Sequence, residues 1–339
     1  MSITISVIVP TYNRPEYLLR LLNGLSLQTI LPSEFEVIAV DDGSRVAYDM
    51  LPDGAWPFSL KILRQENQGE AVARNTGVEA CQGTLLVFLD DDILPEPEYL
   101  HQMHQAHLAY PDAILVGNLD LYSPPDATIF QQITAKSEGI DPNHQPAIFE
   151  IPFTKIWAGV LALPRSLYKK LGGMRPDPKE KRGGWIDMDF AYRAHLGGSQ
   201  FYRVANACAH HDDYSYRTLQ AASKRAYKTA RLSVALFQTY PPLLAYIPMF
   251  IDKTPINFSR DPLALSIRKI IRLVGSTPLS IRILEWTISK FEVYYPNPSI
   301  LVVLYRWTIG AYISRGLRDG QREFGSLKCV STMQESLLL

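Results

Sequence analysis

The chain has 339 residues, of which 47% are hydrophobic and 20% charged, and its 34 basic and 34 acidic residues give a net charge of zero. This composition excludes an intrinsically disordered chain and is sufficient for one large α/β domain or for two domains. The balance conceals an asymmetry, because residues 1–215 carry a charge of −10 and residues 216–339 a charge of +10. We therefore expect two zones with different roles.

Short apolar runs alternate with helical patterns over the first 122 residues, as is typical of βαβ units and a mostly parallel sheet. In such sheets ligands bind at the carboxyl ends of the strands, where the acidic segments 41–42 and 90–92 fall. Strands are predicted at 5–10, 35–44, 60–65, 84–92 and 113–122, and helices at 16–28, 69–81 and 98–110.

The second half of the chain is less regular and then becomes helical. Residues 126–155 read as a loop or short helices, 155–174 as a strand and a short helix, 179–198 as a loop entering a helix, and 199–213 as a strand. From residue 216 the pattern is helical and basic, with several proline breaks. The predicted division is a catalytic domain at 1–215, with halves at 1–122 and 123–215, followed by a basic helical region at 216–339.

The segment Asp90-Asp91-Asp92 follows directly on the apolar run 85–89. Asp90 and Asp92 are spaced to place two carboxylates on one side of the turn after a strand. Carboxylate oxygens suit Mg²⁺ or Mn²⁺, which commonly bridge to the phosphates of a substrate. The alternative is a surface loop that merely begins with acids.

Several short motifs, in their order and spacing, resemble those of family 2 glycosyltransferases, which are inverting enzymes with the GT-A fold. They are "SVIVPTYNRPEYL", "VIAVDDGS", "NQGEAVARNTG" and "FLDDD", followed by "AGVLALPRSLYKKLGGM", "GGWIDMDFAYRAHLGG" and "FYRVANACAHH". The resemblance covers residues 4 to about 213. It implies a Rossmann-like mixed or parallel sheet flanked by helices, with the C-terminal helices as an extension.

The resemblance also implies residues on the donor side. Asp42 or its neighbour Asp41 would accept a hydrogen bond from the nucleotide base, and Asp92 would ligate the metal. Arg74 would meet the nucleotide, although a solvated helix cation is the alternative. Pro10, Thr11 and Asn13 would line the base pocket, Asp90 would contact the ribose and the metal region, and Asp91 is placed on the donor side without a specific task.

The segment "WIDMDFAYR" would hold the catalytic base, and Asp187 matches its position. Ile186 stands where the family pattern has Glu, which puts the acceptor contacts in doubt. The alternative for Asp187 is a helix N-cap. On the acceptor side we also place Asp189, Trp157 and Trp185, although both tryptophans could equally belong to the core.

His210 and His211 stand where the family often has a further metal ligand. The register favours His211, with His210 as the alternative, and a neutral imidazole binds Mn²⁺ well. A surface histidine held by hydrogen bonds is the other interpretation. The expected cofactor is therefore Mn²⁺ or Mg²⁺.

The resemblance implies metal-dependent, inverting transfer of one sugar from a nucleotide-sugar to a hydroxyl of a glycan or lipid-linked acceptor. The expected donor is a UDP-sugar. This chemistry belongs to polysaccharide or glycolipid biosynthesis. The alternatives are an inactive nucleotide-sugar-binding protein and a nucleotidyltransferase.

The location and the partners of the chain are also open to prediction. The three cysteines form no metal or redox motif, which fits a reducing compartment, and no signal peptide is visible, so a cytoplasmic protein is expected. No nucleic-acid partner is expected. Residues 263–318 combine apolar faces with Arg and Lys, which predicts contact with the cytoplasmic face of a membrane or an ordinary helical subdomain.

Overall fold

The computed structural model describes residues 3–46, 48, 56–121, 127–135, 145–176, 184–212, 216–259 and 261–327. The chain divides into two compact units, of which the first comprises residues 1–122 and 138–213 and the second residues 123–137 and 214–339. The sequence assigned residues 123–137 to the catalytic domain. In the structure their helix α4 (Ile129–Ala135) packs with the C-terminal helices, because Phe130 is buried among them.

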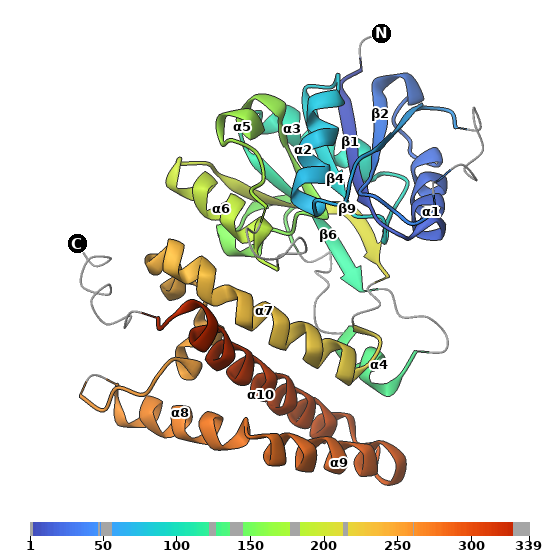
Figure 1. Cartoon of the computed structure of the whole chain (residues 1–339). Coiled ribbons are helices and arrows are strands. Elements are labelled where there is room, and N and C mark those ends of the chain that lie inside the picture. The colour runs from blue at the N-terminus through green and yellow to red at the C-terminus, as the bar shows by residue number, and fades with distance from the viewer. Residues whose placement is uncertain are drawn as a thin grey trace. The chain divides into compact units, whose positions relative to one another are not determined.

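The first unit is built on one mixed sheet of nine strands within the described residues (Figure 1), in the order β3-β2-β1-β4-β8-β6-β9-β5, with β7 paired to β9. β1 to β4 run parallel to one another and β6 runs parallel to β9, whereas β8, β5 and β7 are antiparallel to their neighbours. The strands are β1 (Ile5–Thr11), β2 (Phe35–Asp41), β3 (Ser59–Arg64), β4 (Leu85–Leu89), β5 (Ile93–Pro95), β6 (Ile114–Leu121), β7 (Ile148–Glu150), β8 (Val160–Pro164) and β9 (Phe201–His211).

Helices flank this sheet (Figure 1). The residues that these helices bury are mostly apolar. The strands β1, β2 and β4 are almost wholly buried, as expected for central strands covered on both faces. The mixed sheet flanked by helices that the sequence predicted is therefore confirmed. The helices are α1 (Pro15–Ser26), α2 (Glu70–Ala80), α3 (Tyr99–Ala109), α5 (Arg165–Lys170) and α6 (Ile186–Leu196).

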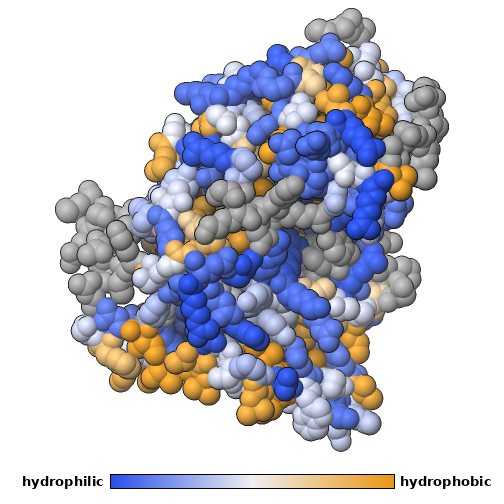
Figure 2. Space-filling view, viewed as in Figure 1, coloured by the Kyte–Doolittle hydropathy of each residue, from blue (hydrophilic) through white to orange (hydrophobic). Residues whose placement is uncertain are grey.

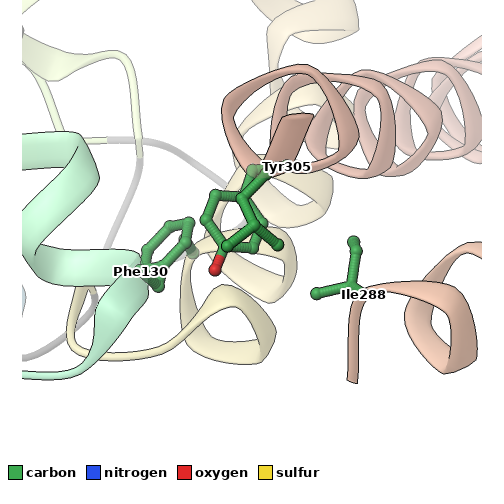
Figure 3. Close-up of a cluster of buried hydrophobic side chains, with 5 residues drawn as sticks. Phe130, Ile288 and Tyr305 are labelled. Carbon is green, nitrogen blue, oxygen red and sulfur yellow. The ribbon is translucent and has the colours of Figure 1, made fainter. Parts of the chain in front are cut away.

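The second unit is helical and has a hydrophobic cluster of its own. Phe130, Ile288 and Tyr305 point toward one another in Figure 3, and the rings of Phe130 and Tyr305 meet edge-on at 5.0 Å. No described helix is both long and apolar enough to cross a membrane. Besides α4, the α-helices of this unit are α7 (Leu219–Thr239), α8 (Leu263–Gly275), α9 (Pro278–Tyr294) and α10 (Pro298–Phe324).

Helices α7 and α10 pack with their backbones in close contact. A Cβ atom at Gly316 would collide with the carbonyl oxygen of Tyr227, and one at Gly320 with that of Arg231. Glycine at these two positions therefore allows the close approach of the helices. Beyond residue 307, the side of α10 that faces α7 is consequently buried in this unit.

Candidate active site

The carboxyl ends of the central strands lie at one edge of the sheet. In the parallel register Thr11 lies opposite Asp41, and Asp41 opposite Arg64, so β1, β2 and β3 end together. Strand β4 pairs with β1 and leads directly into residues 90–92. The two acidic segments found in the sequence are thus brought to the same edge.

Two arginines hold the three consecutive aspartates. The guanidinium of Arg74 donates to Asp90 at 2.6 Å, and its side chain is almost completely buried. Nη1 of Arg14 lies 3.0 Å from Oδ1 of Asp91 and 3.0 Å from Oδ2 of Asp92. Because a buried carboxylate is costly without a positive partner, these arginines make the acidic segment compatible with the fold.

Asp91 differs from its neighbours in having an evident structural role. Its side chain is buried, and its second carboxylate oxygen accepts a hydrogen bond from Thr11 Oγ1 at 2.8 Å. Burial raises the pKa of Asp91 to about 7, although the charge of Arg14 opposes the shift. Both of its oxygens are occupied by the protein, so Asp91 steadies the turn after β4 and presents neither oxygen outward.

Asp92 lies beside His211, whereas His210 lies elsewhere. His211 Nε2 is 3.4 Å from Asp92 Oδ1, while His210 Nε2 is 2.6 Å from Glu96 Oε1. Neighbouring residues of a strand point to opposite faces, which explains the separation of the two histidines. Burial disfavours the charged form of Asp92, but His211 and Arg14 outweigh it and hold its pKa below the usual value.

The donor atoms of Asp92 and His211 fit a divalent cation of the Mn²⁺ type, which accepts both carboxylate oxygen and imidazole nitrogen. Within the described ranges no group of three or more His, Cys, Asp or Glu side chains is arranged to hold a metal ion. A cation at this pair would therefore complete its coordination with oxygens of a substrate or of water.

Asp41 and Asp42 have different surroundings. The carboxylate of Asp42 accepts hydrogen bonds from Gln65 Nε2 and from the backbone N–H groups of Gln68 and Gly69, at 2.8–2.9 Å, and so fixes the loop that leads into α2. Oδ2 of Asp41 is buried and accepts no hydrogen bond from the described residues, with Arg64 Nε 3.7 Å away. Asp41 therefore has a carboxylate oxygen that can still accept a hydrogen bond, whereas both oxygens of Asp42 already accept hydrogen bonds from the protein.

The residues predicted to line a base pocket shape the loop after β1. Thr11 Oγ1 lies 2.8 Å from Tyr48 OH as well as bonding Asp91. Asn13 has a left-handed backbone with φ of 55°, which Asn tolerates better than most residues. Its Oδ1 accepts a hydrogen bond from the backbone N–H of Arg45. Pro10, the third predicted residue, is half-buried near the end of β1.

Helix α2 anchors the loop that precedes the predicted base. Asn75 Nδ2 donates to the carbonyl of Met174 at 2.8 Å, and its Oδ1 accepts from Tyr168 OH and from the Met174 backbone N–H. From the other side, Arg193 donates to the carbonyls of Leu171 and Gly173. Arg74, on the same helix as Asn75, retains a buried Nε with no hydrogen-bond partner among the described residues.

Asp187 occupies the first turn of α6. The N-cap is Trp185, so the N-cap position predicted as an alternative for Asp187 is wrong by two residues, although Asp187 still accepts a hydrogen bond from the Met188 backbone N–H at 2.8 Å. Burial raises the pKa of this half-buried carboxyl, and the charges of Arg74 and Asp90 also act on it, in opposite directions. Asp187 thus lies within electrostatic range of the Arg74–Asp90 pair.

The other residues predicted on the acceptor side differ in accessibility. Asp189 forms an ion pair with Arg193 at 2.8 Å, and Ile186 is buried, so both contribute to the packing of α6. Trp157 is 42% exposed, which is incompatible with a core position. Trp185 is half-buried at the helix N-terminus.

The sequence interpretation missed Arg14, which bridges Asp91 and Asp92, and Arg20, which pairs with Asp212 at 2.8 Å. Arg14 could have been found from the sequence, because it follows β1 at the same sheet edge as the acids and three neighbouring carboxylates require cations. The pairing of Arg20 with a residue 192 positions away had no local signal.

Residues 6–169 match a family model described as Glycosyl transferase family 2. Among curated proteins, validoxylamine A glucosyltransferase of Streptomyces hygroscopicus subsp. limoneus is 30% identical over 228 residues, which are 57% of this chain and 48% of that protein. Glycosyltransferase AglE of Haloferax volcanii is 40% identical over 104 residues, 29% of this chain and 33% of that protein. The chain thus spans half or less of the length of these relatives.

A solved structure of S. aureus TarS 1–349 in complex with UDP-GlcNAc resembles the chain with a TM-score of 0.51 and 16% sequence identity. The alignment covers 96% of this chain and 93% of that one. At this identity the likeness concerns the fold. It extends over nearly the whole chain and is not confined to the residues of the family model.

Proposed function

Residues 6–169 form a glycosyl transferase family 2 domain, and on this premise we propose that the chain transfers a single sugar from a UDP-sugar to a hydroxyl acceptor with inversion at the anomeric carbon. The observation that carries the proposal is the gathering of the acidic segments 41–42 and 90–92 at one edge of the sheet, where β1, β2 and β4 end. The charges of Asp90 and Arg74 also affect the pKa of Asp187. The acceptor class would be a glycan or a lipid-linked sugar of a polysaccharide or glycolipid pathway.

The donor nucleotide would bind at the sheet edge. Asp41 is the better acceptor for an N–H of the base, because the oxygens of Asp42 are engaged by the loop 65–69. Asp90 is partly exposed and would receive the ribose while paired to Arg74. The buried Nε of Arg74 supports a further contact to the nucleotide, since an unpaired buried donor is costly.

Asp92 and His211 would hold a Mn²⁺ or Mg²⁺ ion, which when bound neutralises the charge of a diphosphate leaving group. The approach of His211 Nε2 to Asp92 Oδ1 supports this assignment. Arg14 would keep Asp92 ionised and fixed in position, because it donates to the oxygen that does not face His211.

Asp187 would remove the proton from the acceptor hydroxyl as the hydroxyl oxygen attacks the anomeric carbon. A carboxylate whose pKa is raised by burial is a stronger base than an exposed aspartate, which suits this role. The exposed ring of Trp157 offers an apolar surface on which an acceptor sugar could stack.

The rate of transfer is expected to fall on acidification from a higher pH than an ordinary aspartate would give. The base must be deprotonated, and burial raises the pKa of Asp187 above the usual value of about 3.9. A kcat/KM profile against pH should therefore show an acid limb displaced to higher pH. A limb at the ordinary aspartate pKa would contradict the role given to Asp187.

Replacing Gly159 with alanine is expected to weaken UDP binding by at least about tenfold. A Cβ at this position would lie 2.5 Å from Asp90 Oδ2 and 2.9 Å from its Cγ, so Asp90 would have to leave its pairing with Arg74. Titration calorimetry measures the change. Gly275→Ala, where a Cβ meets nothing within 4 Å, is the control and should bind normally.

The reaction itself is tested by following the products. A UDP-sugar incubated with Mn²⁺ and a set of hydroxyl acceptors should yield UDP together with a sugar-extended acceptor. Pyrophosphate released from a nucleoside triphosphate would instead indicate a nucleotidyltransferase. Donor binding without any product, over a broad set of acceptors, would favour the inactive sugar-nucleotide-binding protein.

A further inference from the structure

The large hydrophobic side chains that the structure leaves exposed are concentrated in one part of the second unit. Among the described residues, 18 of the 26 lie between Met249 and Trp307. Figure 2 shows such side chains gathered over α8 and α9. Apolar patches of this extent on a folded protein commonly mark an interaction site.

The exposed apolar residues form one stripe on each of three helices. The opposite sides of the helices are buried, at Ser266 and Lys269 on α8, at Ile281 and Ile288 on α9, and at Leu301 and Tyr305 on α10. We call the three stripes together the apolar-basic face. Its apolar members are Leu263, Ile267, Ile270, Ile271, Leu273 and Val274 on α8, Leu279, Ile283, Trp286, Val293 and Tyr294 on α9, and Ile300, Val303 and Trp307 on α10, with exposures from 42% to 79%.

The exposed charges of the face are all positive. Arg268, Arg282, Lys290 and Arg306 are exposed, and Lys290 lies over the ring of Tyr294 at 5.6 Å.

The only acids within residues 263–307 are Glu285 and Glu292. Their carboxylates accept hydrogen bonds from the hydroxyls of Tyr312 and Tyr305 on the inner side. Residues 263–307 therefore combine exposed aliphatic and aromatic side chains with exposed cations and contain no fully exposed acid.

We propose that the apolar-basic face binds the surface of an anionic membrane, with α8, α9 and the start of α10 lying in the headgroup region. Helices with an apolar stripe bordered by Lys and Arg bind in this way, and Trp and Tyr are favoured at the membrane–water boundary. Each cation near an anionic surface adds to the attraction. A second copy of the chain is a poorer partner, because a self-complementary contact would bring like charges together.

The structure narrows the predicted membrane segment of residues 263–318. Thr308, Ala311 and Leu317 are buried, and the glycines at 316 and 320 pack α10 against α7. The part of α10 beyond Trp307 thus stabilises the helical unit, and the membrane contact ends near that residue.

The test is cosedimentation of the full chain with vesicles of phosphatidylcholine alone and of phosphatidylcholine mixed with phosphatidylglycerol. Binding to the mixed vesicles is expected, with little binding to the neutral ones and a loss at high salt. Ile283→Glu with Trp286→Glu should weaken binding at least about tenfold, and so should Arg282→Glu with Lys290→Glu. Leu108→Glu, at an exposed apolar residue of α3, is the matched control and should bind as the unaltered chain does.

Folding and oligomeric state are read in parallel by circular dichroism and light scattering. The charge-reversal variant alters only exposed cations and is expected to fold normally, so it keeps the test decisive if the apolar variant unfolds. No binding to either vesicle, or equal binding of the folded charge-reversal variant, would overturn the proposal. A dimer of the unaltered chain that dissociates in the apolar variant would overturn it in favour of a second copy.

Discussion

Asp187→Asn is expected to slow sugar transfer by about 10²–10⁴-fold while leaving the affinity for UDP nearly unchanged. Asparagine keeps the size of the side chain and can still accept the hydrogen bond from the Met188 backbone N–H, but it cannot take a proton from the acceptor. The acid limb of the pH profile should disappear with it. Steady-state rates with saturating donor, together with calorimetric UDP binding, measure the two effects separately.

The control for this variant is Asp112→Asn, at an exposed aspartate in the loop after α3. It removes the same charge at a distance from the site and should leave the rate unchanged. If Asp187→Asn retained full activity, another group would have to be the base. If it lost UDP binding as well, the residue would belong to the donor site instead.

Asp92→Asn and His211→Ala are each expected to lower the Mn²⁺-dependent rate at least about a hundredfold, since metal stabilisation of a leaving group contributes several kcal/mol. Each variant removes one of the two donors that face each other at 3.4 Å. Because the metal would join Asp92 and His211 to the diphosphate, UDP affinity should also lose its dependence on Mn²⁺. Calorimetry with and without the ion measures this directly.

His210→Ala provides the matched control. It removes the same kind of side chain one residue away, from a histidine that pairs with Glu96 at 2.6 Å. Its activity and its metal dependence should stay close to those of the unaltered chain. An equal loss of activity in both histidine variants would mean that the substitutions disturb the end of β9, and not that His211 binds the metal.

The fold of the first unit could be predicted from sequence because its signals are local. Buried apolar runs such as residues 85–89, alternating with amphipathic helices, define parallel β/α units without knowledge of contacts. The antiparallel strands β5 and β7 have three residues each, too few to give a period. The sequence predicted a loop or short helices at residues 126–155 but not the packing of α4 with the C-terminal helices. That packing depends on a contact between Phe130 and Tyr305, which are far apart in the chain.

The sequence could predict which residues lie at the candidate site, but not which residues each of them would contact. The carboxylates followed from strand ends and from the resemblance, but the partner of each one is decided by the tertiary structure. Arg74 was expected to face the nucleotide and is found in an ion pair with Asp90. Asp42 or its neighbour Asp41 was expected to accept a hydrogen bond from the base, and the oxygens of Asp42 already accept hydrogen bonds from the loop 65–69. Hydrogen bonds between segments that are distant in the chain produce no periodic pattern in the sequence, so they could not be predicted.

The same limit applies to the two histidines at the end of β9. The sequence favoured His211 as a metal ligand, with His210 as the alternative, and a shift of one residue reverses the face to which each side chain points. The pairing of β5 with β9, which sets this register opposite Ile93, involves a strand that was not predicted. The different neighbours of the two histidines, Asp92 for His211 and Glu96 for His210, therefore depend on a strand pairing that the sequence did not predict.

The central claim is tested most directly by thermal unfolding of the full chain with UDP, other nucleoside diphosphates and their sugar conjugates, each with and without Mn²⁺. A ligand that binds the native state raises the unfolding temperature by an amount set by its affinity. We predict a shift with UDP and at least one UDP-sugar that is larger in the presence of Mn²⁺ and becomes independent of the ion in Asp92→Asn. The absence of a shift with every nucleotide, with or without the ion, would contradict the account.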